Sequence, residues 1–254
     1  MTGPDPGRQG VLDALAARFA GSVDAHSAGS VRPPPEIPPE ADGVVRAMPV
    51  ILRIERDPLP ERTPLLEAAA EAAVAVCLDE RAAPGGPWYD AVRAWTDGRI
   101  RKIARRARGA HWRAVQEIDG VTVAAGSAEV RALLPGPVDD VPREVSRLQI
   151  GGTDLDPDDP GPPGRDRPLV VLTPHVEMSL GKAAAQVGHA SMILSAVHGW
   201  TASRPFAVRE ASSDDWNALC ATVERGAAVA VRDAGFTEVD PGTITCIAID
   251  RRQG

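Results

Sequence analysis

The sequence predicts an α/β protein of three layers, in which helices cover both faces of a small, mixed four-stranded sheet. Two observations favour this class. Short apolar runs alternate with Ala-rich or amphipathic segments over residues 167–254, and strands that alternate with helices form layered α/β structures. Residues 43–155 show a related order of segments, so the fold is also expected in the form of two tandem copies.

The elements of residues 167–254 follow in the order strand, helix, strand, helix, strand, strand. The apolar run 169–172 predicts a buried strand, and the Ala-rich segment 181–197 has helical spacing. After a strand over 205–211, the polar residues 212–215 provide N-cap chemistry for a helix that ends near residue 225. Two final strands are predicted over 227–231 and 244–249.

Composition divides the chain into four parts. Residues 1–42 are rich in Gly, Pro, Ser and Asp and predict a disordered tail, with helical apolar spacing only over 11–19. Residues 43–155 predict an N-terminal α/β domain. Residues 156–166 predict an acidic, Pro-rich linker. Residues 167–254 then form a C-terminal domain, in which the residues with chemical potential lie.

The net charge of −7 lies mostly in the tail and the linker, so both domains are close to neutral. This balance is not typical of a nucleic-acid-binding protein. No run approaches the roughly 20 apolar residues of a membrane helix, and early acidic residues argue against a signal peptide. We therefore expect a cytoplasmic protein without a membrane partner. The three scattered cysteines lack zinc-ligand spacing and predict buried thiols.

Polar side chains line one face of the predicted helix 181–197. Lys182, Gln186 and His189 are four and three residues apart, which places them on the same face. The helix begins at Gly181, directly after a strand and a loop, and the free N–H groups of such a helix start attract phosphate or a developing oxyanion. A solvent-exposed stripe without a function explains the same spacing.

A second candidate site begins where a predicted strand ends. Residues 227–231 lead into Asp233 and the turn residue Gly235. Ligands of open α/β sheets tend to bind just beyond strand ends. Asp233 could there orient a water molecule, pair with Lys182, or merely cap the turn.

Other chemistries lack their motifs. The loop before Lys182 has Val176 where a nucleotide-binding loop needs glycine, and no Gly-x-Ser-x-Gly elbow is present. The histidines lack metal-ligand spacing with nearby cysteines or acids, so no metal is expected.

Two motifs resemble the signatures of archaeal-type peptidyl-tRNA hydrolases, the second family of these enzymes. In the first, over residues 178–190, Gly-Lys, Ala-Ala-Gln and His-Ala recur at the family's spacing, at Gly181, Gln186 and His189 among others. The second is Arg232-Asp233-Ala234-Gly235 with Thr237, followed by Pro241-Gly242-Thr243 and Thr245. The order of the motifs and the strand pattern fit as well.

The resemblance implies a mixed four-stranded sheet, usually in a homodimer, and hydrolysis of the ester between peptide and tRNA without a cofactor. Ester hydrolysis needs an oriented water, a base and a stabilised oxyanion. Asp233 would act on the water directly or through Thr237, and Lys182 would stabilise the oxyanion or hold the 3′-terminal phosphate. His189 would support either role. The implied catalytic residues are thus Lys182, His189, Asp233 and Thr237, and the implied substrate-binding residues are Gly181, Gln186, Thr243 and Thr245.

Three departures from the family pattern remove positive charge. Residues 172–174 stand where the family usually ends its first strand with an Arg and an Asp. Leu180 stands where it often has a second lysine, and Phe236 where it commonly has a basic residue. Because phosphate contacts supply most nucleic-acid affinity, we expect the C-terminal domain alone to bind tRNA less tightly than the family pattern implies. Two other functions stay open: a member that binds tRNA or a protein without hydrolysis, and hydrolysis of a different acyl ester or amide.

Residues 43–155 resemble a decayed copy of residues 167–254. The run 49–52 parallels 168–171, and an Ala-rich helix over 67–76 follows. Val130-Arg131 parallels Val231-Arg232, and 142–150 parallels 241–249, which places Ala132 at the position of Asp233. A copy without these catalytic residues would serve as an internal pseudo-dimer partner in place of a second subunit.

The same half contains the densest basic run, Arg99 to Arg113, with seven basic residues and no acidic one. Arg105, Arg106 and Arg108 are candidates for the tRNA contacts that the C-terminal half lacks, although a solvated face explains the run equally well. The run also contains Lys102, one of only two lysines among 28 basic residues, the other being Lys182.

Overall fold

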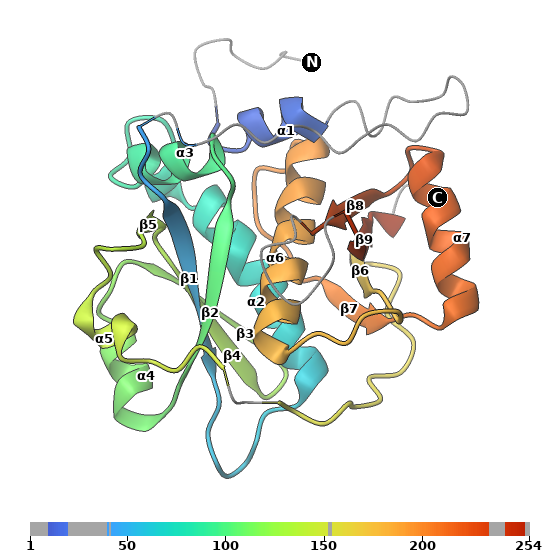
Figure 1. Cartoon of the computed structure of the whole chain (residues 1–254), viewed down its shortest axis with the longest axis horizontal. Helices are drawn as coiled ribbons and strands as arrows, with labels where there is room; N and C mark the ends of the chain where they lie inside the picture. Colours follow the sequence, from blue (N-terminus) through green and yellow to red (C-terminus); the bar gives the residue numbers. More distant parts are fainter. Residues whose placement is uncertain (1–9, 20–39, 41, 152–153, 234–241, 252–254) are drawn as a thin grey trace.

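The computed structural model describes residues 10–19, 40, 42–151, 154–233 and 242–251. Within these ranges, two sheets lie on either side of a central pair of helices. From left to right, Figure 1 shows α4 (Gly109–Val115) and α5 (Arg143–Ser146), the first sheet, the central helices α2 (Arg62–Leu78) and α6 (Leu180–Val197), the second sheet, and α7 (Ser213–Glu224). Helices cover both faces of each sheet, which confirms the predicted α/β class.

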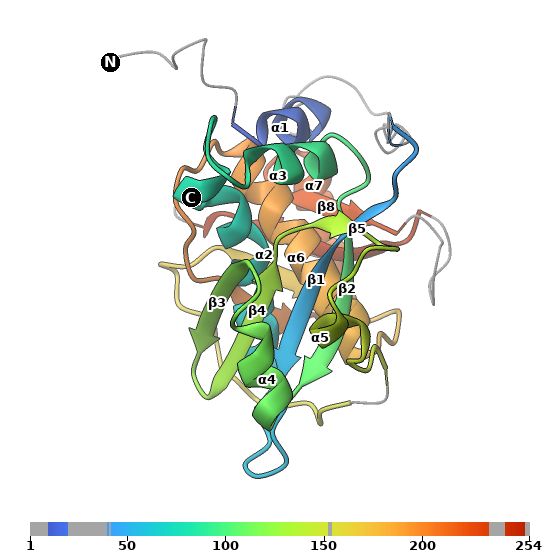
Figure 2. The same cartoon turned by 90° about the vertical axis from the view of Figure 1, so that its left-hand side faces the viewer.

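The first sheet has the strand order β2-β1-β4-β3 and faces the viewer in Figure 2. Its strands are β1 (Arg46–Arg53), β2 (Arg101–Ala107), β3 (Gly120–Ala125) and β4 (Ala128–Leu133), and the short β5 (Gly136–Pro137) pairs with β1. The second sheet has the order β7-β6-β9-β8, with β6 (Leu169–Leu172), β7 (Ala207–Glu210), β8 (Val229–Arg232) and β9 (Ile244–Ile249). These C-terminal elements lie where the sequence predicts them.

The two sheets share the order and the directions of their strands. In each, the first two strands are parallel, and the last strand pairs antiparallel with the first and the third. A row of valine, alanine and valine crosses both sheets: Val50–Ala132–Val121 in the first and Val170–Ala248–Val229 in the second. The register therefore matches β3 with β8 and β4 with β9.

This register corrects the predicted alignment of the last two strands. Val130-Arg131 belongs to β4, the counterpart of β9, and residues 142–150 contain α5 instead of a strand. The prediction overlooked the hairpin loop at residues 126–127, where Gly126 has a φ of +53°. Counting along the ladder, Ala125 and not Ala132 takes the position of Asp233.

The central helices join the two halves through one apolar core. Each helix packs on its own sheet and also contacts the edge strand of the other sheet, α2 against β7 and α6 against β2. Ser191 of α6 donates a 2.6 Å hydrogen bond to the carbonyl oxygen of Ala70 in α2. The buried cluster extends from β1 and β4 through both helices to β6 and β9.

Part of the predicted tail is ordered. Residues 13–19 form α1 (Asp13–Phe19), which contacts α6 and buries Val11, Leu12 and Leu15. Arg18 donates hydrogen bonds to the carbonyl oxygens of Thr96, the last residue of α3 (Tyr89–Thr96), and of Gly98, which follows this helix. The helical apolar spacing noted over residues 11–19 thus corresponds to a short helix, whose apolar face packs against α6.

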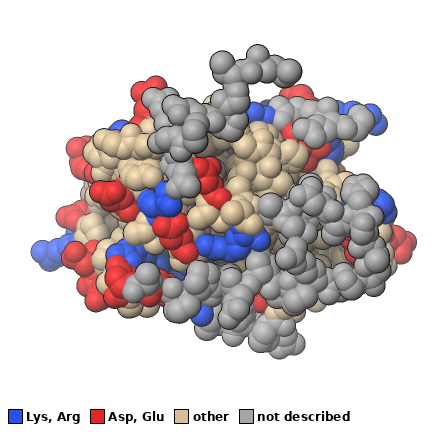
Figure 3. All heavy atoms as spheres, turned by 90° about the horizontal axis from the view of Figure 1, so that it is seen from above, with Lys and Arg blue, Asp and Glu red and all other residues tan. Residues whose placement is uncertain are grey.

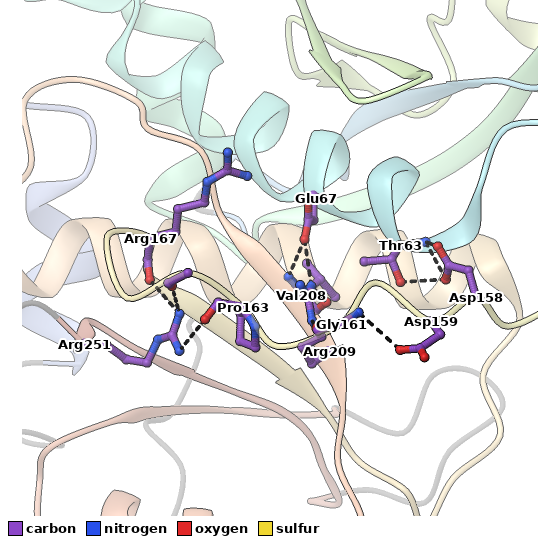
Figure 4. A network of polar contacts seen from close by, with 11 residues as sticks. Thr63, Glu67, Asp158, Asp159, Gly161, Pro163, Arg167, Val208, Arg209 and Arg251 are labelled. Atoms are coloured by element: carbon purple, nitrogen blue, oxygen red, sulfur yellow. Dashed lines mark hydrogen bonds and ion pairs between the residues drawn. The ribbon is translucent and has the colours of Figure 1, made fainter.

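The predicted linker 156–166 forms hydrogen bonds with both halves (Figure 4). Asp158 accepts hydrogen bonds from the backbone N–H and the hydroxyl of Thr63 at the start of α2. Arg209 of β7 donates to the Gly161 carbonyl and to Glu67 of α2. Glu67 also accepts the N–H of Val208 on the sheet edge.

None of the helices in the described ranges has the length and apolar character that a membrane-spanning helix needs.

Candidate active site

A buried ion pair lies where α6 begins and β8 ends. The Lys182 ammonium group contacts the Asp233 carboxylate, and their side chains are only 11% and 5% exposed. The side-chain nitrogen of Gln186, one turn further along α6, donates a 3.1 Å hydrogen bond to the same Asp233 oxygen. Two of the residues predicted on one helix face thus converge on the predicted aspartate.

Thr245 completes the cluster from β9. Its hydroxyl donates a 2.7 Å hydrogen bond to the side-chain oxygen of Gln186, which directs the amide NH₂ group of Gln186 toward Asp233. Thr245 is fully buried. The chain Thr245, Gln186, Asp233 therefore leaves each buried polar group with a partner, as buried polar groups require.

A β-bulge places Thr245 in this cluster. Val231 pairs with Cys246 but Arg232 pairs with Ile244, so Thr245 is left as the extra residue of the ladder. Bulges often lie next to active sites, where they redirect a side chain. The corresponding β3–β4 ladder of the first sheet is regular over its whole length.

The turn around Asp233 is held through its backbone. The N–H of Asp233 donates to the Thr243 carbonyl over 2.9 Å, and the Asp233 carbonyl accepts the N–H of Gly242 over 2.8 Å. Thr243, a predicted substrate-binding residue, thus contributes a main-chain contact here. The predicted catalytic residue Thr237 lies outside the described residues.

The start of α6 is flanked by the first sheet. Ser179 caps the helix by accepting the N–H of Lys182. A β-carbon added at Gly181 would lie 3.4 Å from Ala104 of β2 and 3.6 Å from the Ile150 carbonyl. The N-terminal half therefore forms one wall beside the helix start that was predicted to bind phosphate or an oxyanion.

His189 lies on the same helix but contacts a different partner. Its Nδ1 is 3.2 Å from the Nζ of Lys102, which extends from β2 of the N-terminal half. Burial lowers the pKa of Lys102 to about 7. Burial, and then the charges of Lys102 and Lys182, hold the pKa of His189 well below its usual value. Lys102 was not predicted as a site residue, and its rarity was the only sequence signal.

The three candidate arginines of the basic run have different surroundings. Arg105 donates to the carbonyl oxygens of Ser146 and Leu148, and Arg106 donates to the side chain of Gln149. Arg108 is exposed and borders an open surface pocket with Glu55 and His111, among others. Arg105 and Arg106 thus also hold the segment that passes the start of α6.

Charges of both signs are interspersed on the top face of the molecule, over the part that the described residues form (Figure 3). Within the described ranges, no three His, Cys, Asp or Glu side chains lie close enough together to hold a metal ion. Fold and site together define the class: an α/β protein with a buried Lys–Asp pair between a helix start and a strand end.

Comparison with known proteins agrees with this class. The family model described as "Peptidyl-tRNA hydrolase PTH2" matches residues 168–252. A peptidyl-tRNA hydrolase of Haloquadratum walsbyi is 37% identical over 92 residues, which cover 32% of this chain and 80% of that protein. No solved structure matches the chain. The chain therefore belongs to the PTH2 family of peptidyl-tRNA hydrolases, through its C-terminal unit.

Proposed function

We propose that this protein hydrolyses the ester bond of peptidyl-tRNA at the cluster of Lys182, Asp233, Gln186 and Thr245. The observation that carries the proposal is the buried Lys182–Asp233 pair, which brings the two family motifs into contact. An isolated buried pair is costly to maintain, so its location beside a helix N-terminus supports a functional reason for it.

The geometry suggests a division of labour. Asp233, with one oxygen held by Lys182 and Gln186, accepts a proton from a water molecule that attacks the ester carbonyl carbon. The Lys182 ammonium group and the positive end of the α6 helix dipole stabilise the resulting oxyanion. Collapse breaks the bond from the carbonyl carbon to the ribose oxygen, which takes up the proton. Thr237 would relay the proton in an indirect version of this step, and His189 would support it.

We further infer that the N-terminal unit replaces a second subunit. It has the strand order of the C-terminal unit, and α2 and α6 contact each other's sheet edges in a reciprocal way. Ala125 stands at the position of Asp233, so this unit lacks the acid of the site. Its contribution to substrate would be tRNA contacts from Arg105, Arg106 and Arg108, in a cytoplasmic enzyme of translation.

Hydrolysis of an N-acetyl-aminoacyl-tRNA tests the proposal. Asp233→Asn keeps the shape of the side chain but removes the base, so we expect the single-turnover rate to fall at least about 100-fold. Asp215→Asn is the matched control, because Asp215 lies on the exposed first turn of α7. Equal rates for Asp233→Asn and the control would contradict the assignment.

The alternative is a member that binds tRNA or a protein without hydrolysis. The departures at residues 172–174, Leu180 and Phe236 favour it, because they remove basic side chains. The hydrogen-bonded state of every polar member of the cluster argues against it. Binding of the same tRNA in a filter assay without release of the acyl group would support the alternative. Release from a different acyl ester alone would indicate another substrate.

A further inference from the structure

The two lysines of this chain lie against the same helix. Lys182 belongs to α6, and Lys102 reaches α6 from the edge strand β2 of the other half. Gly188 makes room for it, since a β-carbon there would lie 3.1 Å from both Cδ and Cε of Lys102. The side chain of Lys102 thus fills space that an ordinary helix residue would occupy.

The end of the Lys102 side chain has several neighbours. Its Nζ lies 3.2 Å from His189 Nδ1, 3.4 Å from the Ile100 carbonyl and 5.1 Å from the centre of the Trp95 ring. Cys77 of α2 and Cys246 of β9 are the titratable groups that face it besides His189. Within the described part of the chain, no carboxylate forms an ion pair with it.

We propose that Lys102 is a positioning residue for the site of the C-terminal unit, where it fixes His189 as a neutral imidazole with its proton on Nε2. An ammonium group has donors only. While Lys102 is charged, Nδ1 of His189 must therefore accept its hydrogen bond. The proton of the neutral ring is then on Nε2, because the bond at one ring nitrogen sets the state of the other.

This arrangement gives the N-terminal unit a direct role beyond packing. The unit lacks an acid at the position of Asp233, yet it supplies the partner that sets the protonation of His189. The part of the inference that concerns hydrolysis rests on the proposed function. The part that concerns the imidazole does not, and the two can be measured separately.

Imidazole ¹⁵N shifts of the full-length protein at pH 6 test the first part, with the His189 signal assigned by its loss in His189→Gln. We expect the Nε2–H tautomer in the wild type and in Lys102→Arg, which keeps a charged donor. In Lys102→Met we expect a mixture of tautomers and a higher His189 pKa, because a nearby positive charge is removed. Arg101→Met is the control, because Arg101 is the neighbour of Lys102 on β2 but forms its ion pair with Glu40.

Single-turnover hydrolysis tests the second part in the same variants. We expect the rate at saturating substrate to fall roughly tenfold in Lys102→Met, with its acidic limb moved to higher pH, and to recover in Lys102→Arg. An unchanged tautomer and pKa in Lys102→Met would overturn the inference, as would an unchanged rate and pH profile. If the wild type shows the Nε2–H imidazole signals but no hydrolysis, the proposed function is refuted and the Lys102–His189 contact is supported.

Discussion

Thr245 shows how one side chain can set the geometry of the cluster. Its hydroxyl determines which end of the Gln186 amide faces Asp233, and the β-bulge turns it toward α6. A carboxylate whose orientation depends on a buried chain of hydrogen bonds loses that orientation when the first donor is removed.

Thr245→Val is therefore expected to lower both stability and rate. Loss of the donor leaves the buried Gln186 oxygen unsatisfied, which costs about 1–3 kcal/mol of the free energy of unfolding. The hydrolysis rate should fall roughly tenfold with KM little changed. Urea unfolding and single-turnover assays measure the two effects. Thr222→Val is the control, since the Thr222 hydroxyl bonds to the Ala218 carbonyl on exposed α7; an equal loss in both variants would contradict a specific role for Thr245.

Local spacing predicts much of the cluster at the scale of single residues. Lys182 and Gln186 share a helix face because of their four-residue spacing, and Asp233 meets them because it follows a strand of the sheet that α6 covers. The contact of Lys102 with His189 joins residues that are 87 positions apart and belong to different halves. No periodicity within either segment contains information about that contact.

At the scale of the elements, the two glycines of α6 differ in their surroundings. Gly188 faces α2 at close range, whereas Gly181 does not. A β-carbon at Gly188 would lie 3.0 Å from the β-carbon of Ala73 and 3.1 Å from Lys102, whereas one at Gly181 would make contacts of 3.4 Å and longer. The distances at Gly188 require the neighbouring side chains to move, whereas the distances at Gly181 are ordinary van der Waals contacts.

Gly188→Ala and Gly181→Ala form a matched pair on one helix. Both gain helix propensity of roughly 1 kcal/mol, but only Gly188→Ala must also overpack a central layer, at a cost of about 1–3 kcal/mol. We expect Gly181→Ala to be the more stable variant by at least about 1 kcal/mol in denaturant unfolding. The reverse order of stability would show that the helices can separate without cost.

The elements of the two halves differ in how far sequence predicts them. In the C-terminal unit, apolar runs and cap residues mark each strand and helix. In the N-terminal unit, the alternation of residues 120–125 was overlooked, so β4 was matched with the wrong strand. Gly126-Ser127 between two alternating segments is the signal that could have revealed the hairpin.

At the scale of the whole molecule, the apolar core runs through both sheets without a break. The faces of α6 that do not contact its own sheet are covered by α2, β2 and α1 of the same chain. This coverage was not predictable from either half alone, because it depends on how the halves dock.

We therefore expect the protein to be a monomer in solution. Light scattering coupled to size exclusion should give the monomer mass, 26.7 kDa, at all concentrations tested. The physical reason is that the internal partner already buries the helix face on which a second subunit would pack. A stable dimer would contradict the internal pseudo-dimer.

The measurement that tests the central claim most directly is single-turnover release of the acyl group from N-acetyl-aminoacyl-tRNA by four proteins: the wild type, Lys182→Ala, Asp233→Asn and the double variant. If the buried pair is the hydrolytic site, each single variant loses at least about 100-fold, and the double variant loses little more than either, because the two groups act as one unit. Release by the wild type that persists in the double variant, while each protein remains folded, would contradict the claim.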